Sequence, residues 1–445
     1  MPTTAFSPQL PFLLLPLTFL LASGSGSTQF VLLNVQQLLA SAHHARLGKN
    51  LSLSLPLHHV DSLSTKTTAL RHRVSAMLLR DELRAAALLR RLSLSSADFS
   101  SDVISGVAQG SGEYFVRVGV GSPPSQQFLV LDSGSDLSWV QCQPCSQCYQ
   151  QPDPLFDPAR SASFRPVGCT SPACSILSAS SCAAGSCSYR VTYGDGSYTR
   201  GTLVFETLTF DGAAVVDGVA IGCGYRNRGL FAGADGLLGL GWGPMSLVGQ
   251  LGGAAGGAFG YCLPGRGEAG GTLVLGRTEA VRPGSVWVPL VRNGRAPSFY
   301  FVGVAAMTVG GVRLDSSGAD GTVVDTGTAV TRLPGEMYAA LREGFVEAAA
   351  GLPRAPRVSI FDTCFALGGY GEVRVPTVGF YFEGGAELTL PARNFLIPVD
   401  DVGTFCFAFA ESGSEMAILG NIQQEGIQIT VDAANGFLGF GPDTC

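Results

Sequence analysis

The strongest constraint on the fold is a short pattern that occurs twice along the chain. Each copy is an apolar run that ends in Asp, a hydroxyl residue and Gly: FLVLDSGS at 128–135 and GTVVDTGT at 321–328. An apolar-apolar-Gly run follows each copy, in GLLGLG at 236–241 and AILGN at 417–421, with its Gly 107 and 95 residues after the Asp. An internal repeat of this kind predicts two lobes of similar length, each of which supplies one carboxylate.

The sequence pattern after residue 106 predicts an all-β fold. Short runs rich in β-branched and aromatic residues recur, separated by Gly, Pro and Asp, and 59 glycines are scattered among them, as in strands joined by tight turns. Such runs lie at 114–118, 128–131, 189–193 and 202–205. Helical patterns are few, and the best of them are 68–92, rich in Ala, Leu and Arg, and 334–350, which begins with Pro.

The N-terminus predicts a secretory signal peptide at 1–27. These residues contain no Lys, Arg, Asp or Glu, and their apolar centre at 10–22 holds two prolines and is too short to span a bilayer. Small residues follow at 23–27, as near a signal-peptidase site. We therefore expect secretion to the extracellular space or the vacuole, with no membrane anchor. The segment lacks the basic residues that usually begin a signal peptide, so a chloroplast transit peptide is the alternative. Such peptides are Arg-rich, however, and the first Arg here is Arg46.

The charge distribution predicts a propeptide at 28–105. This segment carries nine Lys and Arg against five Asp and Glu, a net charge of +4. Because the whole chain has a net charge of −6, the rest of it carries −10. A basic segment before an acidic body is the electrostatic arrangement of a segment that inhibits its own protein. A solvated linker helix is the alternative. The one N-x-S/T sequon places a glycosylation site at Asn50, inside this segment.

The body then divides into two predicted lobes, 106–288 and 289–445, with the boundary near 281–295. The chain has 12 cysteines, all at or after Cys142, and an even number in a secreted chain predicts up to six disulfides. Free core cysteines or a metal cluster are the alternatives, but all five His precede the first Cys, so we expect no metal. Seven of the cysteines lie in a loop-rich insertion at 142–187, which we expect to need cross-links: Cys142, Cys145, Cys148, Cys169, Cys174, Cys182 and Cys187.

The residue composition of the body leaves carboxylates as the candidate catalytic groups. The body after residue 106 contains neither His nor Lys, which excludes Ser-His, Cys-His and Ser-Lys pairs, Schiff-base lysines and a P-loop. A net −10 argues against a nucleic-acid surface, and nothing indicates a cofactor.

Two Asp side chains, Asp132 and Asp325, are the candidate catalytic groups. When two carboxyls lie close together they cannot both ionise, so one stays protonated while the other activates a shared water. Gly134 and Gly327 let the backbone approach the carboxyls closely. The flanking hydroxyls have distinct predicted roles: Ser133 and Thr326 bond across the lobe interface, while Ser135 and Thr328 donate to the carboxylates.

Several segments together resemble the pepsin-like aspartic proteases, in the atypical plant branch that includes the nepenthesins and the guard-cell aspartic proteases. They are GEYFVRVGVGSPP (112–124), LDSGSDLSWVQC (131–142), YGDGSYTRG (193–201), DGLLGLG (235–241), VDTGT (324–328) and ILG (418–420). The resemblance implies a bilobal acid-protease fold with two lobes related by a pseudo-twofold axis, few short helices and a helical N-terminal prosegment.

The resemblance also implies site residues and two disulfides. Tyr193, with Gly194 and Asp195, would form a flap that closes over substrate, Trp139 would donate to the Tyr193 hydroxyl, and Ile418 would lie at the substrate site. Without the family, core packing for Trp139 and an ordinary hairpin for Tyr193 are the simpler interpretations. The implied disulfides are Cys364–Cys406 and Cys262–Cys445. The other eight cysteines, the seven of the insertion and Cys223, stay unassigned.

The resulting hypothesis is a secreted, monomeric aspartic endopeptidase, made as a zymogen that its own prosegment inhibits and active at acidic pH. It would cut polypeptides bound in an extended conformation. Ser133 stands where most relatives have Thr, which predicts altered efficiency rather than inactivity. The alternative is an inactive homologue that acts as a binding protein, like the plant glycosidase inhibitors on this scaffold. A chloroplast protease that also contacts DNA is a third hypothesis, which the acidic body disfavours.

Overall fold

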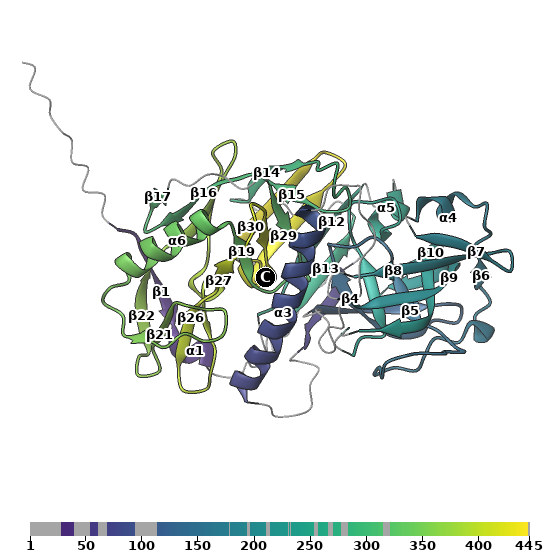
Figure 1. Cartoon of the computed structure of the whole chain (residues 1–445), viewed down its shortest axis with the longest axis horizontal. Helices are drawn as coiled ribbons and strands as arrows, with labels where there is room; N and C mark the ends of the chain where they lie inside the picture. Colours follow the sequence, from purple (N-terminus) through teal and green to yellow (C-terminus); the bar gives the residue numbers. More distant parts are fainter. Residues whose placement is uncertain are drawn as a thin grey trace, which may run out of the picture.

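A computed structural model of the chain (Figure 1) describes residues 28–39, 54–60, 69–93 and 114–443, apart from short gaps. The gaps are 178, 194–195, 211–213, 230, 232, 253–256, 266–269, 277–283 and 315–320. The predicted signal peptide, Asn50 and the predicted end of the propeptide therefore lie outside the described residues. Among those described, no helix combines the length and apolar character needed to cross a membrane.

The described chain is mostly β and forms two lobes, which lie at the left and right of Figure 1 with one long helix in front. The N-terminal segment, residues 28–93, contains β1 (Phe30–Asn34), α1 (Val35–Leu39), β2 (Ser54–His59) and α3 (Leu70–Ser93). The first lobe contains β3 (Tyr114–Val120), β4 (Ser125–Asp132), β5 (Trp139–Gln141), β6 (Arg165–Pro166), α4 (Pro172–Ile176), β7 (Ser180–Ala183), β8 (Ser186–Thr192), β9 (Tyr198–Phe210), β10 (Ala214–Arg228), β11 (Gly236–Gly239) and α5 (Leu247–Leu251).

The second half of the chain is equally rich in strands. It begins with β12 (Ala258–Cys262), β13 (Gly271–Leu275), β14 (Val286–Val291), β15 (Phe301–Val302), β16 (Val304–Val309), β17 (Val312–Leu314), β18 (Thr322–Val324), β19 (Thr331–Leu333), α6 (Gly335–Ala348) and β20 (Arg354–Ala355). It continues with β21 (Cys364–Ala366), β22 (Glu372–Pro376), β23 (Val378–Phe382), β24 (Glu387–Thr389), η3 (Ala392–Asn394), β25 (Leu396–Pro398), β26 (Thr404–Phe407), β27 (Phe409–Glu411), β28 (Ala417–Leu419), β29 (Ile427–Asp432) and β30 (Phe437–Asp443). The 3-10 turns η1 (Pro158–Arg160) and η4 (Asn421–Gln423) complete the described elements.

The sequence duplication corresponds to a structural one. In the first lobe β4 pairs in parallel with β11, and Gly239 lies opposite Asp132. In the second lobe β18 pairs in parallel with β28, and Val324 lies opposite Leu419. Each Asp-bearing strand therefore lies beside the apolar-apolar-Gly strand of its own lobe, a pairing that the repeat alone did not specify.

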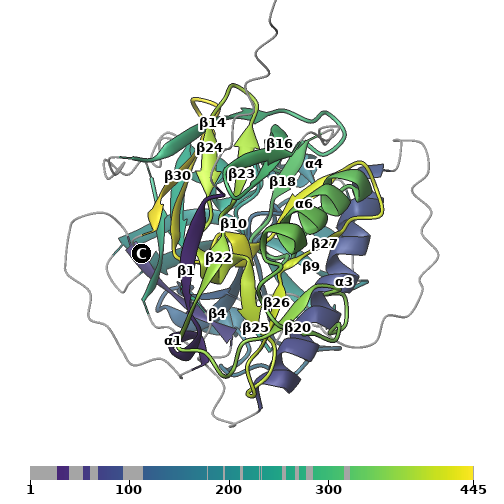
Figure 2. The ribbon, with the colours of Figure 1, turned by 90° about the vertical axis from the view of Figure 1, so that its left-hand side faces the viewer.

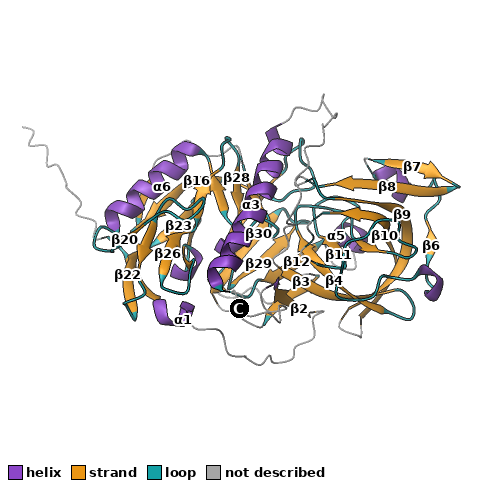
Figure 3. Ribbon diagram, turned by 60° about the horizontal axis from the view of Figure 1, so that its bottom comes forward, coloured by secondary structure: helices purple, strands orange, loops and turns teal. Residues whose placement is uncertain are grey.

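A shared sheet joins the two lobes. Its strands run in the order β2, β13, β12, β29, β30 and β14, and every neighbouring pair is antiparallel. β2 also pairs with β3, so a strand of the N-terminal segment is hydrogen-bonded into the body of the protein. Figure 3 shows β30, β29, β12 and β2 of this sheet beside the lower end of α3.

Both predicted helices are present. The pattern at 68–92 forms α3 and the pattern at 334–350 forms α6, with ends shifted by one or two residues. α3 lies across the front of the molecule between the lobes (Figures 1 and 3). Its buried side chains recur at helical spacing along one face: Val74, Met77, Leu78, Asp81, Ala85, Leu88 and Leu89. The apolar ones pack into the clusters that surround Val330 and Ile418 of the second lobe.

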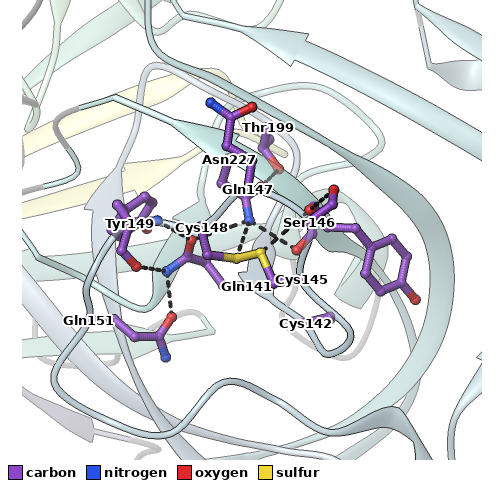
Figure 4. The surroundings of a disulfide bond; sticks show 12 residues. Gln141, Cys142, Cys145, Ser146, Gln147, Cys148, Tyr149, Gln151, Thr199 and Asn227 are labelled. Carbon is purple, nitrogen blue, oxygen red and sulfur yellow. Dashed lines mark hydrogen bonds between the residues drawn. A yellow bond between two sulfur atoms is a disulfide. The ribbon is translucent and has the colours of Figure 1, made fainter.

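The disulfides supply the pairings that the sequence left open. The predicted Cys364–Cys406 bond is present. Cys262 is also disulfide-bonded, and its predicted partner Cys445 lies outside the described residues. The eight unassigned cysteines form four further bonds: Cys142–Cys223, Cys145–Cys148, Cys169–Cys182 and Cys174–Cys187. Around the second of these, Asn227 donates to Cys148 Sγ and to Gln141 Oε1, at 3.5 and 3.3 Å (Figure 4).

These disulfides should differ in their contributions to stability. Cys364–Cys406 closes a loop with a sequence separation of 42, whereas Cys145–Cys148 spans only 3. Because a cross-link restricts the unfolded chain more when its loop is longer, we expect the Cys364→Ala/Cys406→Ala variant to lose about 4 kcal/mol of unfolding free energy. The Cys145→Ala/Cys148→Ala variant should lose about 1.5 kcal/mol by the same relation. Urea unfolding at neutral pH measures both, and an equal loss in the two variants would contradict the argument.

Candidate active site

The two Asp side chains lie at the ends of equivalent strands. Asp132 is the last residue of β4, and Asp325 follows β18 directly. The backbone amide of Leu240 donates to Asp132 O at 2.9 Å, and the Asp325 amide donates to Leu419 O at 3.2 Å. These bonds tie each carboxyl to the apolar-apolar-Gly run of its lobe. Both side chains are buried, at 1% and 0% exposure, so their charges interact strongly with their neighbours.

The residues that follow each Asp bond across the lobe interface. The amide of Ser133 donates to Thr326 Oγ1 at 3.1 Å, and the amide of Thr326 donates to Ser133 Oγ at 3.0 Å. Ser133 Oγ then donates to Val324 O at 3.3 Å, and Thr326 Oγ1 to Leu131 O at 3.1 Å. Serine therefore retains the reciprocal bonds predicted for this position. The network holds the two Asp backbones in one fixed relation.

Each carboxylate accepts two local hydrogen bonds in the same pattern. The Gly134 amide and the Ser135 hydroxyl donate to Asp132 at 3.0 and 2.6 Å. The Gly327 amide and the Thr328 hydroxyl donate to Asp325 at 3.2 and 2.6 Å. In both cases the amide reaches Oδ1 and the hydroxyl reaches Oδ2. These bonds orient the carboxyls so that the two Oδ1 atoms face a common space.

Arg84 of α3 occupies that common space. Its Nη2 atom lies 2.7 Å from Asp132 Oδ1 and 2.8 Å from Asp325 Oδ1, and its Nε donates to Asp325 Oδ2 at 3.0 Å. A single nitrogen thus contacts both carboxyls. A water molecule is of similar size, so the same position suits a water held by both groups. A Cβ atom on Gly327 would overlap the guanidinium, so the absence of a side chain there lets Arg84 lie close to the backbone.

The electrostatics of this cluster favour the ionised carboxylate. The pKa of Asp325 lies below its usual range: burial acts to raise it, but the charge and hydrogen bonds of Arg84 outweigh burial. The pKa of Arg84 is raised, because the charges of Asp132 and Asp325 outweigh the effect of its burial. The ion pair is therefore complete at neutral pH. Protonation of Asp325 weakens it as the pH falls through the depressed pKa of that carboxyl.

A second acidic residue fixes α3 beside the site. The buried Asp81 carboxylate accepts from the amides of Ala329 and Val330, at 2.5 and 2.9 Å, and pairs with Arg332 Nη2 at 2.7 Å. Burial raises the pKa of Asp81, although the Arg332 charge acts in the opposite direction. Asp81 and Arg84 are three positions apart, so they lie on the same face of the helix.

Two of the residues that the resemblance assigns to the flap region, Trp139 and Tyr193, contact each other. Trp139 Nε1 donates to the Tyr193 hydroxyl at 2.7 Å, as the resemblance implies. Phe231 packs edge-to-face against both rings, at centroid distances of 4.8 Å from Trp139 and 5.6 Å from Tyr193. Gly194 and Asp195 lie outside the described residues. Ile418 is buried on β28, in one cluster with Ala85 and Leu88 of α3.

The sequence alone did not single out Arg84, Asp81 or Phe231. A signal for Asp81 was present, because a charged residue interrupts the apolar stripe of the predicted helix at a buried position. Arg84 had no comparable signal among the many arginines of the segment. For Phe231, no motif in the sequence marks an aromatic partner of the flap. Among the described residues there is no group of three or more His, Cys, Asp or Glu side chains able to hold a metal ion.

Family comparisons agree with this geometry. Residues 114–277 match the family model described as "Xylanase inhibitor N-terminal", and residues 299–442 match "Xylanase inhibitor C-terminal". The chain is 59% identical to Protein ASPARTIC PROTEASE IN GUARD CELL 2 of Arabidopsis thaliana over 394 residues, which cover 84% of this chain and 83% of that protein. The chain belongs to the pepsin-like aspartic proteases. This protease is also 35% identical to aspartic proteinase nepenthesin-2 of Nepenthes gracilis, over 91% of this chain and 92% of that one.

The fold of the protease has solved counterparts as well. It matches conglutin gamma from lupine seeds with a TM-score of 0.61 and 19% identity, over 75% of this chain and 92% of that chain. Basic 7S globulin from soybean matches with a TM-score of 0.60 and 20% identity, over 74% and 91% of the two chains. At these identities the likeness concerns the fold alone. The class of the protease, an aspartic-type endopeptidase, rests on its relationship to the named proteases.

The flap hydrogen bond yields a prediction for this protease. Tyr193→Phe removes the hydroxyl that accepts from Trp139 while keeping the ring packed against Phe231. Losing one neutral hydrogen bond costs about 1 kcal/mol, so kcat/KM for a peptide substrate should fall about fivefold. Tyr198→Phe, which removes a 3.2 Å bond from the first residue of β9 to Gln147, is the matched control and should leave kcat/KM unchanged. Equal losses in both variants would contradict a specific role for Tyr193.

Proposed function

We propose that this protease is a secreted zymogen in which residues 28–105 are a prosegment that blocks the active site through Arg84. The observation that carries the proposal is the single Arg84 nitrogen at 2.7 and 2.8 Å from the two Oδ1 atoms. That position is where a catalytic water must lie if both carboxyls are to act on it. The basic N-terminal segment and the acidic body support the same interpretation.

The proposed reaction begins when Arg84 leaves and a water takes its place between Asp132 and Asp325. Because like charges at this separation disfavour double ionisation, one carboxyl keeps its proton. The ionised carboxylate removes a proton from the water as the water attacks the peptide carbonyl carbon. The protonated carboxyl gives its proton to the carbonyl oxygen, which leaves a tetrahedral diol. The carboxyl that took the water proton then passes it to the leaving amine as the C–N bond breaks, and the other carboxyl takes a proton back from the diol, which restores both groups. The local donors from Ser135 and Thr328 hold each carboxyl in position.

An acidic optimum follows from two requirements. The reaction needs one protonated carboxyl, and release of Arg84 needs loss of carboxylate charge. Asp325 has a depressed pKa in the blocked state, so its contribution to holding α3 is fully present above the ordinary Asp value of about 4 and is lost as the pH falls from there through that depressed pKa. Acid therefore favours both release of the prosegment and catalysis.

The substrate is proposed to be a polypeptide in an extended conformation, with apolar side chains beside the cut bond. Cluster residues Phe299, Phe301 and Ile418, which α3 covers through Ala85, Leu88 and Leu89, provide an apolar lining for it. We further propose that the protease is a monomer, that 1–27 direct it to the extracellular space or the vacuole, and that the lobes divide near residue 288.

A binding protein without activity remains the competing function, since the matched family models are named for xylanase inhibitors. The two functions differ in their need for the dyad. A binding protein has no use for the complete set of hydroxyl and amide donors that surrounds both carboxyls here.

The test is acid treatment of the full-length protein. The protein is held at pH 7.5 or brought to pH 3.5, then sampled for intact mass, N-terminal sequence and cleavage of a quenched fluorescent peptide. We expect a stable, inactive chain at pH 7.5. At pH 3.5 we expect cleavage activity together with a new N-terminus between Ala97 and Gly112. Full activity of the uncut chain at pH 7.5 would overturn the zymogen proposal, and absence of activity at every pH would favour the binding protein.

A further inference from the structure

The strand β22 of the C-terminal lobe has an unusual partner. Within the described residues β22 pairs with one strand only, and that strand is β1 of the N-terminal segment. The two form an antiparallel two-stranded sheet with Phe30 opposite Pro376 and Asn34 opposite Glu372. Figures 1 and 2 show them side by side on the outer flank of the C-terminal lobe. Nothing in the proposed blocking of the active site requires this contact.

Backbone bonds continue the pairing at both ends of β1. The Gln29 amide donates to Gly310 O at 2.8 Å, and Gln29 O accepts from the Thr377 amide at 3.0 Å. At the other end, the Val35 amide donates to Gly371 O at 3.1 Å. In an antiparallel pair the residues that bond to the partner alternate along the strand. Val31 and Leu33 therefore direct their backbone groups at β22, while Gln29 O and the Val35 amide bond to residues that flank it.

The side chains of this segment alternate as strictly as its backbone. Leu33 and Val35 are buried, at 1% and 0% exposure, in the main core of the protein. Phe30 and Leu32 point outward, at 42% and 61% exposure. Val31 is half-buried and packs on the same core. The lobe thus offers an edge for main-chain pairing and apolar space for alternate side chains, which is the arrangement by which proteins bind extended peptides.

We propose that the edge of β22 is a peptide-binding site of the C-terminal lobe, separate from the active site, and that residues 28–39 occupy it. The ligand it takes is an extended segment with apolar side chains at three alternate positions, matching Val31, Leu33 and Val35. The site binds by strand addition and needs no covalent link to its ligand. Residues 28–39 therefore stay on the lobe when the chain that follows them is cut. This inference goes beyond the proposed function and does not depend on catalysis.

The experiment uses the full-length protein at pH 7.5, where α3 fills the active site. A recognition sequence for a site-specific processing protease is inserted between residues 40 and 53, and the chain is cut there. Gel filtration without denaturant followed by mass spectrometry then reports whether residues 28–39 elute with the rest of the chain. We expect retention at one fragment per chain. Loss of the wild-type fragment at micromolar protein concentration would overturn the proposal.

Matched variants distinguish strand addition at β22 from nonspecific association of the fragment with the protein. Leu33→Asp in the fragment places a charge at a buried position and should release it, while Leu32→Asp at the exposed neighbouring position should not. Synthetic peptides of residues 28–39 with a fluorescent label give the affinities, after the cut fragment has been exchanged out. N-methylation of Leu33 should weaken binding at least tenfold, and N-methylation of Leu32 should change it less than threefold.

Each outcome decides the proposal independently of proteolytic activity. Equal release by the two Asp variants, or equal weakening by the two N-methyl peptides, would contradict strand addition at β22. Thermal unfolding of the cut chain checks that the lobe stays folded in every variant. If the protein proved to have no peptidase activity, these binding measurements would stand unchanged, so the two proposals can fail separately.

Discussion

Replacing Arg84 by Met is expected to turn the full-length protein, which we propose to be an inactive zymogen, into one that cleaves peptides without removal of residues 28–105. Met keeps an unbranched apolar side chain and removes the charge that pairs with both carboxylates. Breaking a buried ion pair costs about 3 kcal/mol or more, which corresponds to at least about a hundredfold shift toward the open site. We therefore expect the initial rate of peptide cleavage by uncut protein at pH 5.5 to rise about a hundredfold.

The control for this variant is Arg71→Met. Arg71 lies at the start of the same helix with an exposed side chain, so the substitution removes the same charge without touching the dyad. Its initial rate should match that of the wild type. Intact mass at each time point shows that the measured chain is uncut. If Arg84→Met remained as inactive as the wild type under these conditions, the blocking role of Arg84 would be rejected.

Asp132→Asn and Asp325→Asn should each abolish peptide cleavage and self-processing. An amide can neither remove a proton from water nor exchange one with its partner, so either change disables the pair. Loss of a general acid or base typically costs 10² to 10⁴ in rate, and we expect kcat to fall by about 10³ or more. The measurement is cleavage of the quenched peptide after acid treatment.

The matched control for both is Asp157→Asn. The Asp157 carboxylate caps a surface turn by accepting from the Ala159 amide at 3.0 Å, and Asn caps equally well. This variant should keep wild-type kcat. Full activity in either dyad variant would exclude the proposed chemistry, whatever the result with Arg84.

The parts of the fold that local sequence determines were predictable. The strands before Asp132 and Asp325 carry their own β-forming runs, and the repeat indicated that each lobe would supply one carboxylate. The donors Ser135 and Thr328 lie three positions after their Asp, so the geometry of one turn fixes their bonds. The reciprocal hydrogen bonds between Ser133 and Thr326 were predictable as well, because the duplicated motif places a hydroxyl residue directly after each Asp.

The parts that depend on distant contacts were not predictable. The arginines of α3 are all good helix formers, and only docking against Ala329 and Val330, through Asp81, determines that Arg84 reaches the carboxylates. The Cys142–Cys223 pairing has a sequence separation of 81, and no local spacing encodes it. The pairing of β1 with β22 joins residues more than three hundred positions apart, so its register depends on the folded lobe.

The pH dependence of kcat/KM for a peptide substrate, measured on the acid-treated protein from pH 2 to 8, tests the central claim most directly. If two carboxyls share one proton and act on one water, activity depends on a single protonation state of the pair. The predicted result is a bell-shaped profile with its maximum at acidic pH and loss of activity toward neutrality. A rate that rises continuously to pH 8 would contradict the assignment of catalysis to Asp132 and Asp325.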